Sequence, residues 1–540
     1  MTMTIPHRST LFRVSILTLF LLALTAGTAY PATLRDVAIS EVAWMGTTVS
    51  SADEWIELYN NTGTSVGLSG WTLTAADGTP SITLSGSIPA NSYYLLERTD
   101  DSSVPGVTAD SIYSGALGDG GEDLILRDNS ANIVDRVNSS AGWFSGHAAG
   151  RVPMVRVNTL ADGSLSANWN YNPRCGTATN TAGISRTCTL TTTNVGQPLQ
   201  YSVFFDLLAT TAITTTLSHT PMEDALLARI NAASTSVDVA LYGLDRQSII
   251  DALIAAHGRG VTVRVVGDDD AANVEYTAGY QALRSAGITV ITDTSASQIQ
   301  HNKFMVFDGQ VVWTGSANFT NTDFTLNANN SIVITGTTLA GIYTTEFGEM
   351  WGGAFHSAKT DNTLHSLDYS GTRVESYFSP TDLVAFEVWD ELAHADDTVH
   401  FAMFFWTDDV LTKRVVERLG VGVEFFGVWD QLGAANESSA DGALCAAGAR
   451  IKIEDFNGKV HHKFAVIDVN GSDPTVILGS YNWTDSGAYD NDENTLIIHD
   501  LALAQAYYAE WQRLWSALGE DRLCKPYLIY LPAVAKNTSP

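Results

Sequence analysis

Two segments of the chain repeat one pattern of six residues in the same order, and this duplication constrains the fold more than any other feature. The first copy consists of His301, Lys303 and Asp308, followed by Gly315, Ser316 and Asn318. The second copy, 160 positions later, consists of His461, Lys463 and Asp468, followed by Gly479, Ser480 and Asn482. Chance does not produce six fixed positions twice in order. The sequence therefore predicts two halves with the same fold.

The halves also share the order of their predicted elements. A capping pattern with an acid three residues after the cap opens each half with a helix: Thr220-Pro221 with Glu223, and Ser379-Pro380 with Asp382. Apolar strands are predicted at 236–242, 261–266 and 303–308, and at 398–404, 421–426 and 463–468. Strands that alternate with helices favour parallel pairing. We therefore predict a duplicated α/β unit, with repeats at 201–360 and 370–520, whose two mixed, mainly parallel sheets are related by a pseudo-dyad.

Residues 33–160 show no helical period and alternate short apolar segments with turns rich in Gly, Asn, Asp and Ser. This pattern favours an all-β sandwich of immunoglobulin type. Its segments EWIELYN, LSGWTL and GDGGEDLILRD resemble the lamin-tail domain. The resemblance implies binding to a surface or matrix component. A spacer that only solubilises the rest of the chain is the alternative.

The first 29 residues have the pattern of a signal peptide. Arg8 and Arg13 precede and open an apolar run, Val14 to Leu24, which is too short to span a bilayer and is followed by small residues. We therefore expect a secreted protein. An uncleaved segment that attaches the protein to the cell surface is the alternative.

Four cysteines fit an oxidising compartment. Cys175 and Cys188 enclose a short loop, so a disulfide there would staple the linker 161–200. Cys445 and Cys524 are a second candidate pair. Residues 521–540 form a C-terminal tail that either docks on the chain or serves as a sorting element.

The residue types of the duplicated pattern suit phosphoryl chemistry. Cleavage of a phosphodiester needs a nucleophile, a proton donor for the leaving oxygen and donors around the other oxygens. Two histidines that meet between the repeats can divide the first two tasks. Lys303 and Lys463 would neutralise the phosphoryl charge, and neutral hydrogen bonds to it would come from Ser316, Asn318, Ser480 and Asn482. This arrangement requires no metal or other cofactor.

Over about 320 residues, the two H-x-K-x4-D motifs with their G-S-x-N segments resemble the phospholipase D superfamily. The resemblance implies a metal-independent, two-step displacement through a covalent phosphohistidine, with His301 as the nucleophile and His461 as the general acid. The candidate catalytic residues are His301, Lys303, Asp308, His461, Lys463 and Asp468. For the two aspartates, an orienting role is favoured over a chemical one.

The superfamily often uses a downstream Glu to hold a catalytic histidine ring. Glu493 is the candidate in the second copy, and Asn329 stands at the equivalent position of the first. A neutral partner would raise the pKa of an imidazole less than a carboxylate does. We therefore expect His301, with an amide beside it, to stay neutral and nucleophilic.

The net charge of −30 bears on the substrate. A field of this sign repels polyanions, so a zwitterionic phospholipid such as phosphatidylcholine is slightly favoured. A metal-independent extracellular nuclease on DNA or RNA is the alternative, and a non-catalytic surface- or matrix-binding protein is the rival from another class. No obligate protein partner is expected. The run Asp268 to Asp270 lacks the spacing of a calcium loop and favours a solvated turn.

Overall fold

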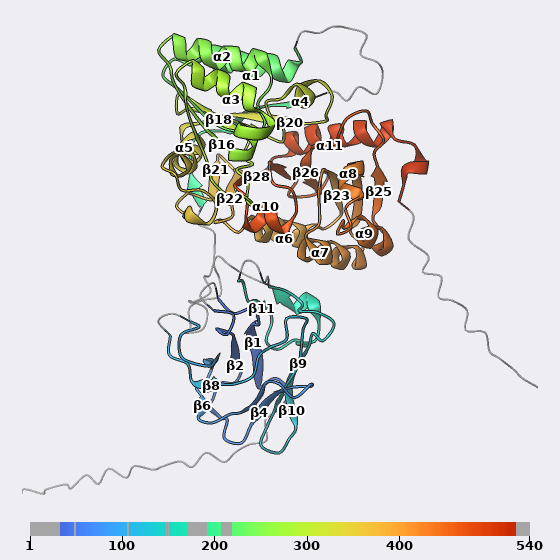
Figure 1. The fold of residues 1–540 in the computed structure, drawn as a ribbon. Helices are drawn as coiled ribbons and strands as arrows, with labels where there is room; N and C mark the ends of the chain where they lie inside the picture. Colours follow the sequence, from blue (N-terminus) through green and yellow to red (C-terminus); the bar gives the residue numbers. More distant parts are fainter. Residues whose placement is uncertain are drawn as a thin grey trace, which may run out of the picture.

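The computed structural model describes residues 33–47, 50–104, 107–146, 148, 151–170, 192–206 and 219–524. The expected signal peptide, Cys175, Cys188 and the tail beyond residue 524 lie outside these residues. Figure 1 shows a β domain followed by a larger unit of two α/β repeats. Within the described residues, no helix is long and apolar enough to cross a membrane.

The β domain is built from two main sheets around one core, which confirms the all-β prediction. In spatial order, the first sheet contains β12 (Trp169–Asn170), β11 (Met154–Arg156), β1 (Val37–Ala43), β2 (Trp55–Asn60), β7 (Tyr93–Arg98) and β8 (Ser111–Tyr113). The second contains β10 (Ile133–Asn138), β9 (Asp123–Arg127), β4 (Thr72–Ala75) and β5 (Ser81–Thr83). A small ribbon pairs β3 (Val66–Gly67) with β6 (Ser87–Ile88).

Each α/β repeat contributes one large sheet. The seven-stranded sheet runs β14 (Gln200–Phe205), β20 (Asn330–Thr335), β19 (Val311–Gly315), β18 (Phe304–Phe307), β15 (Ser236–Ala240), β16 (Thr262–Gly267) and β17 (Thr289–Thr292). The nine-stranded sheet runs β13 (Thr192–Asn194), β21 (Ser366–Tyr369), β22 (Thr372–Ser379), β28 (Glu493–His499), β27 (Thr475–Gly479), β26 (Lys463–Ile467), β23 (Thr398–Met403), β24 (Glu424–Trp429) and β25 (Arg450–Ile453).

Helices cover these sheets. Those of the first repeat are α1 (Pro221–Ala232), α2 (Gln247–Gly258), α3 (Thr277–Ser285), α4 (Asn321–Thr325) and α5 (Thr337–Trp351). Those of the second are α6 (Val384–His394), α7 (Asp409–Gly420), α8 (Gln431–Ala434), α9 (Asp441–Ala447), α10 (Asp485–Tyr489) and α11 (Leu501–Ala517). Helices α1 to α3 pack in one cluster with the first sheet, and α6, α7 and α9 in another with the second.

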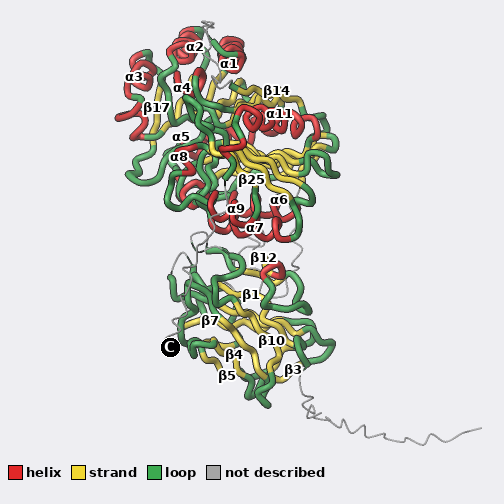
Figure 2. The backbone as a smooth tube through the Cα atoms, turned by 90° about the vertical axis from the view of Figure 1, so that its right-hand side faces the viewer, coloured by secondary structure: helices red, strands yellow, loops and turns green. Residues whose placement is uncertain are grey.

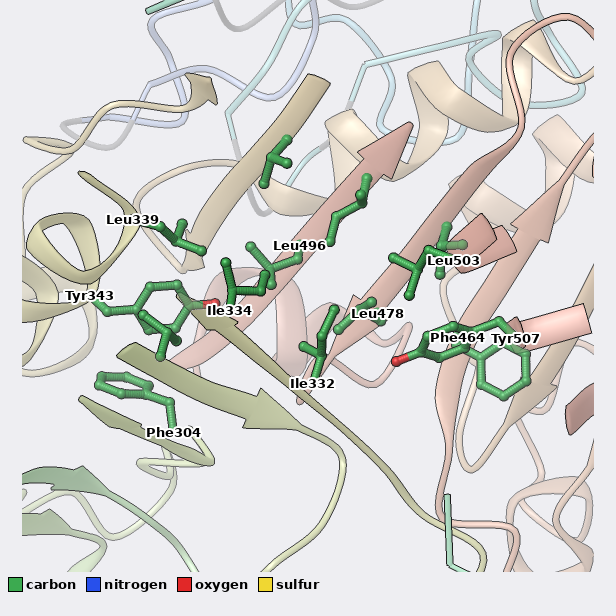
Figure 3. Packing of buried hydrophobic residues seen from close by; sticks show 14 of the residues in the cluster. Phe304, Ile332, Ile334, Leu339, Tyr343, Phe464, Leu478, Leu496, Leu503 and Tyr507 are labelled. Atoms are coloured by element: carbon green, nitrogen blue, oxygen red, sulfur yellow. The ribbon is translucent and has the colours of Figure 1, made fainter. Parts of the chain in front are cut away.

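A third cluster is shared by both repeats (Figure 3). Helices α5 and α11 pack there against apolar side chains from both sheets. Its members include Phe304, Ile332, Ile334, Leu339 and Tyr343 from the first repeat, and Phe464, Leu478, Leu496, Leu503 and Tyr507 from the second. The Thr314 hydroxyl also donates to Asn494 Oδ1 at 2.6 Å across this boundary. The repeats are therefore halves of one folded unit.

The sheets are mixed, but the prediction of mainly parallel pairing is wrong. In the first repeat, β16 pairs parallel with β15 and β17, and the other neighbours are antiparallel. The second sheet likewise has more antiparallel than parallel pairs. The reason lies in the connection after each motif strand. Residues 308–310 separate β18 from β19, whereas a parallel crossover needs about a dozen residues or more.

The capping prediction holds in the first repeat and fails in the second. Helix α1 begins at Pro221, and the Thr220 hydroxyl accepts from the Glu223 amide at 3.2 Å. Ser379, however, is the last residue of β22, and α6 begins only at Val384. Because the backbone at Ser379 is paired with Glu493 in the sheet, this serine cannot cap a helix.

The linker boundaries also need correction. Strand β12 pairs with β11, so residues up to 170 belong to the β domain. Strand β13 pairs with β21 in the second repeat's sheet, although it precedes the first repeat in the sequence. The α/β unit therefore includes Thr192–Asn194 and does not begin at residue 201.

The β domain lies beside the second repeat (Figure 2). Val152 of the β domain belongs to the same buried cluster as Trp389 of α6 and Val415 of α7. The β domain therefore contacts the second repeat through packed side chains and is not joined to it by the linker alone.

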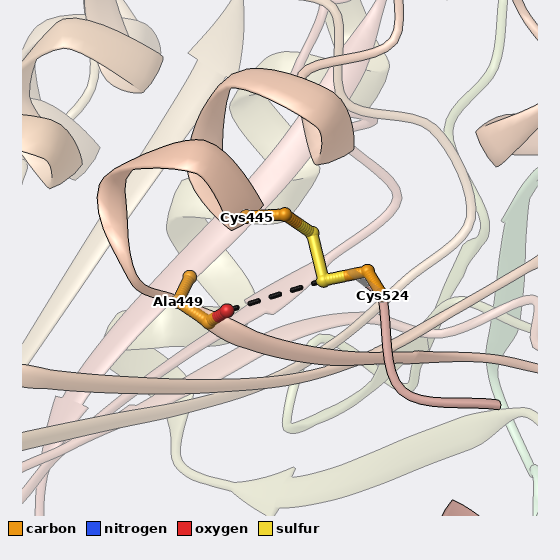
Figure 4. The surroundings of a disulfide bond; sticks show 3 residues. All are labelled: Cys445, Ala449 and Cys524. Carbon is orange, nitrogen blue, oxygen red and sulfur yellow. Dashed lines mark hydrogen bonds between the residues drawn. A yellow bond between two sulfur atoms is a disulfide. The ribbon is translucent and has the colours of Figure 1, made fainter. Parts of the chain in front are cut away.

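Cys445 and Cys524 form a disulfide, with their Cα atoms 6.2 Å apart (Figure 4). Cys524 lies next to the carbonyl oxygen of Ala449, just after the end of α9. The disulfide joins Cys524, at the end of the described residues, to the second repeat. It confirms the candidate pair Cys445 and Cys524.

Candidate active site

The two motif histidines lie where the backbones of the repeats meet. Gln300, which precedes His301, forms an isolated parallel bridge with Asp492, and Val460, which precedes His461, forms one with Ala328. The backbone amide of His301 donates to Asp492 O, and that of His461 to Ala328 O, both at 2.9 Å. Each histidine is therefore anchored by backbone of the other repeat.

The rings are also held across the boundary. His301 Nδ1 lies 2.8 and 2.9 Å from the Glu493 carboxylate oxygens, and His461 Nδ1 lies 2.9 Å from Asn329 Oδ1. The expected pairing within each repeat is therefore wrong. His301 has the carboxylate partner and His461 the amide, because the downstream strand of each repeat carries its orienting side chain to the opposite histidine.

Asp323 stands behind Asn329 and was missed by the sequence analysis. The Asn329 amide donates to Asp323 Oδ1 at 3.1 Å, which turns its carbonyl oxygen toward His461. The only sequence indication was the capping pattern of α4, in which the Thr320 hydroxyl accepts from the Asp323 amide. Gly487 occupies the equivalent position in the second copy, so the two histidine surroundings differ.

This geometry fixes the tautomers of the neutral rings. Asn329 Oδ1 can only accept a hydrogen bond, as can an ionised Glu493, so Nδ1 of His461 and of His301 carries the proton. Each Nε2 then has a lone pair. Both rings are nearly buried, at 8% exposure for His301 and 6% for His461. Two unprotonated nitrogens are thus presented to a site shielded from bulk water.

The motif lysines lie beside these rings. Lys303 Nζ donates to His301 O at 2.7 Å, and Lys463 Nζ to His461 O at 2.9 Å. Burial lowers the pKa of Lys303 to about 8 and that of Lys463 well below its usual value. Burial and the two lysines likewise hold the pKa of both histidines well below the usual range. An anion entering the site would relieve this unfavourable positive potential.

Glu493 is the acidic residue in direct contact with the His301 ring. Burial raises the pKa of its carboxyl group to about 8, against the opposing effect of Lys303. The carboxyl group, the imidazole of His301 and the two lysines therefore form a buried group whose protons can be redistributed when substrate binds.

The G-S-x-N residues contact residues next to the two histidines, and their hydrogen bonds to a phosphoryl group stay a prediction. The Ser316 hydroxyl donates to Asn329 Oδ1 at 2.9 Å, and Ser480 Oγ accepts from the backbone amide of Asn494 at 3.0 Å. Asn318 binds Asp323 through its backbone amide. Asn482 Oδ1 is buried without a hydrogen bond among the described residues.

Asp308 and Asp468 lie outside the site, which corrects their placement among the catalytic candidates. Asp308 follows β18, and its carboxylate accepts from the backbone amides of residues 234–236. Asp468 follows β26 and accepts from those of residues 396–398. The two aspartates fix the loops that precede β15 and β23.

An aromatic ring flanks each histidine. The ring centroid of Tyr242 is 5.5 Å from that of His301, and the centroid of Phe404 is 4.9 Å from that of His461. Tyr242 and Phe404 follow β15 and β23 at equivalent positions. These half-buried rings give the site apolar walls next to its cations.

Three groups of acidic residues and histidines lie close enough to hold a metal, within the described ranges. They are Asp268–Asp269–Asp293, Asp361–His365–Asp382 and Glu375–Glu391–His499. None contains a motif histidine or lysine. The first is nearest, since the amide of Gln300 donates to Asp268 Oδ2 at 3.2 Å.

The fold and the site define a duplicated α/β protein with one His-Lys pair from each repeat. A family model described as "Cardiolipin synthase, PLD-like domain" matches residues 226–351 and 388–515, and the Lamin Tail Domain model matches residues 31–141. A phospholipase D of Rickettsia bellii is 36% identical over 142 residues, which is 26% of this chain and 69% of the relative. The chain belongs to the phospholipase D family.

The chain is also similar to parts of other proteins. A mitochondrial cardiolipin hydrolase of Chlamydomonas reinhardtii is 30% identical over 135 residues, or 25% of this chain and 60% of the relative. This chain spans about 60% of the length of the first curated relatives it matches. The solved phospholipase D family member Nuc from Salmonella typhimurium is 28% identical, with a TM-score of 0.24, covering 28% of this chain and 95% of Nuc.

Proposed function

We propose that the chain is a phosphodiesterase that cleaves its substrate through a covalent phosphohistidine. One observation carries the proposal: two histidines face one site, each with Nδ1 occupied by a partner of the other repeat and each beside a buried lysine. This arrangement supplies a nucleophile, a proton donor and phosphoryl-binding cations together.

His301 is the nucleophile and His461 the general acid. Attack on phosphorus places positive charge on the attacking ring, and the Glu493 carboxylate beside His301 stabilises that charge. His461 faces a neutral amide, so its imidazolium form is the stronger acid. The assignment is the one expected from the sequence, but the reason is reversed, since the carboxylate serves the nucleophile.

The reaction proceeds in two balanced steps. The bound anionic phosphodiester favours the imidazolium form of His461, which takes up a proton at Nε2 from solvent before the chemical step. His301 Nε2 then forms a bond to phosphorus, the bond to the leaving oxygen breaks, and the His461 imidazolium gives that oxygen its Nε2 proton. Water then attacks phosphorus, His461 accepts a proton from the water, and the bond to His301 breaks. Lys303 and Lys463 offset the phosphoryl charge throughout. The reciprocal bridges, Gln300 to Asp492 and Val460 to Ala328, support a pseudo-dyad through this site.

A phospholipid headgroup is the favoured substrate, and a nucleic acid is the alternative. The charge of −30 disfavours a long polyanion. Apolar walls at Tyr242 and Phe404 suit a lipid, and several relatives are named cardiolipin hydrolases or phospholipase D. We also propose that the protein is secreted and that its lamin-tail domain attaches it to a surface. Mass analysis of protein recovered from the growth medium would reveal whether residues 1–29 are removed.

The function is tested with purified protein in excess chelator, offered phosphatidylcholine vesicles, cardiolipin vesicles and plasmid DNA side by side. We expect lipid headgroup release that is lost in both His301→Asn and His461→Asn. Plasmid cleavage lost in both variants would instead establish the nuclease. No turnover of any substrate would favour the non-catalytic binding protein.

The histidine roles are separated with an aryl phosphodiester, whose leaving group needs no proton. His461→Asn should still release the aryl group in a burst and accumulate phosphate on His301, because only the later step fails. His301→Asn should give no burst. A burst in His301→Asn with phosphate on His461 would reverse the assignment.

A further inference from the structure

A second cluster of polar side chains is buried in the second repeat, at the opposite end of β28 from Glu493. It contains Glu375 of β22, Glu391 of α6 and His499, the last residue of β28. Their side chains are 1%, 12% and 6% exposed. These residues come from three elements, so the cluster is a junction within the fold.

The His499 ring points an unsatisfied nitrogen into this junction. Its Nδ1 lies 3.0 Å from Asp473 Oδ1, 2.8 Å from the Thr475 hydroxyl and 3.4 Å from Arg373 Nη2. Its Nε2 is enclosed and makes no hydrogen bond within the described residues. That Nε2 lies 3.7 Å from Glu391 Oε1 and 4.0 Å from Glu375 Oε1. Since Nδ1–H can donate to Asp473, the Nε2 lone pair faces two carboxylates.

We propose that Glu375, Glu391 and His499 bind a divalent transition-metal ion such as Zn²⁺. A tetrahedral ion with bonds of about 2.1 Å holds its ligand atoms about 3.4 Å apart, close to the separations from His499 Nε2. One imidazole nitrogen with two carboxylates favours zinc over calcium or magnesium, which prefer oxygen ligands.

The charges around His499 would favour a bound cation. Three carboxylates, those of Glu375, Glu391 and Asp473, surround His499, and the nearby cation is Arg373. Arg373 contacts both glutamates but is 44% exposed, so it can move toward solvent when an ion enters.

Two further observations support the site: a cavity through which an ion could enter, and a sequence difference between the two repeats. A cavity of about 190 Å³, lined by Glu391, His394, Asp473 and Thr475 among others, adjoins the cluster. Asp473 lies in the connection between β26 and β27, residues 468–474, which is four residues longer than the equivalent connection 308–310 of the first copy. Thr335 stands in the first copy at the position of His499. The longer connection therefore completes a site that only the second repeat has. An ion there would tie β22 and α6 to β28, the strand that carries Glu493.

The test is calorimetric titration of the chelator-treated full chain with ZnCl2, with parallel titrations of CaCl2 and MgCl2. We expect one Zn²⁺ equivalent in the wild type, and weakening by about 10-fold or more in His499→Gln and in Glu391→Gln. His394→Gln is the matched control, because His394 lines the same cavity but is 73% exposed, and it should bind like wild type.

Arg373→Gln keeps the test decisive if a ligand variant folds poorly. Removing the competing guanidinium should tighten zinc binding several-fold, which adventitious surface binding would not do. The proposal fails if the wild type binds no zinc, if His499→Gln and Glu391→Gln bind it as well as wild type, or if calcium binds more tightly than zinc. Because the readout is binding, the result is independent of the phosphodiesterase proposal.

Discussion

At the residue scale, the exchange of orienting side chains gives two similar histidines different properties. His301 meets the Glu493 carboxylate directly, whereas His461 meets the Asn329 amide, behind which Asp323 lies 3.8 Å from the ring. A direct charge stabilises a positive ring more than one placed behind an amide. Two copies of one motif can therefore act as nucleophile and acid.

Replacing Glu493 by Gln should slow formation of the phosphohistidine by about 10- to 100-fold, because the amide keeps the ring position but removes the charge. Rapid-quench measurement of phosphate bound to His301 in a single turnover checks this. Glu437→Gln, at an exposed carboxylate, is the matched control. An unchanged rate in Glu493→Gln would contradict the role of the carboxylate.

His356 forms a buried bridge beside the same segment. Its Nε2 lies 2.9 Å from Asp293 Oδ2 and its Nδ1 lies 3.1 Å from Asp492 Oδ2, while Lys359 contacts the other oxygen of Asp492. Burial alone would lower the pKa of His356, but the hydrogen bond with Asp293 and the charge of Asp492 outweigh it and raise the pKa. Nε2 is hydrogen-bonded to Asp293, whereas the contact of Nδ1 with Asp492 is an ion pair without a hydrogen bond. Both carboxylates therefore favour the imidazolium form through their charge.

This bridge predicts a pH-dependent stability. The imidazolium stabilises the fold fully below the unfolded pKa of the ring, and the contribution is lost as pH rises through the raised folded pKa. Denaturant unfolding should show wild type more stable than His356→Gln by about 3 kcal/mol near pH 6, with a smaller difference near pH 9. His394→Gln, at a 73% exposed ring, should show no such trend. A difference independent of pH would contradict the charged bridge.

At the element scale, the strands and helices that have a local sequence pattern could be predicted. The features that depend on pairing between distant segments could not. The motif strands and helix α1 follow local patterns and were found. Ser379-Pro380 carries the same local pattern as α1, yet strand pairing with Glu493 overrides it. The crosswise histidine partners were missed because equivalent positions in two repeats give no sign of which histidine each one reaches.

The contribution of the disulfide to the free energy of unfolding depends on the length of chain that it closes into a loop. Cys445 and Cys524 are 79 residues apart, so in the loop-entropy account the bond stabilises the fold by about 4 kcal/mol. Cys445→Ser combined with Cys524→Ser should lower the free energy of unfolding by about this amount. Adding reductant should destabilise wild type to the same extent and leave the double variant unchanged. Equal stability of the two oxidised proteins would contradict the prediction.

At the scale of the whole molecule, the α/β unit extends upstream of its first repeat, because β13 pairs with β21. A chain that begins at residue 190 should therefore fold and keep activity without the β domain, whereas one that begins at residue 207 lacks both β13 and β14. The shorter chain should have a lower melting temperature and lower activity. Calorimetry and headgroup release on both truncations check this. Equal behaviour would mean that neither strand matters to the unit.

Each histidine is oriented by a side chain of the other repeat, Glu493 or Asn329. Cutting the chain between its halves, for example near residue 362, would separate these partners. Neither fragment would carry a histidine together with the side chain that orients it. Catalysis would then appear only on association, with a rate that rises with the concentration of the scarcer fragment. The covalent link between the halves thus acts as an effective concentration, keeping the site assembled at any dilution.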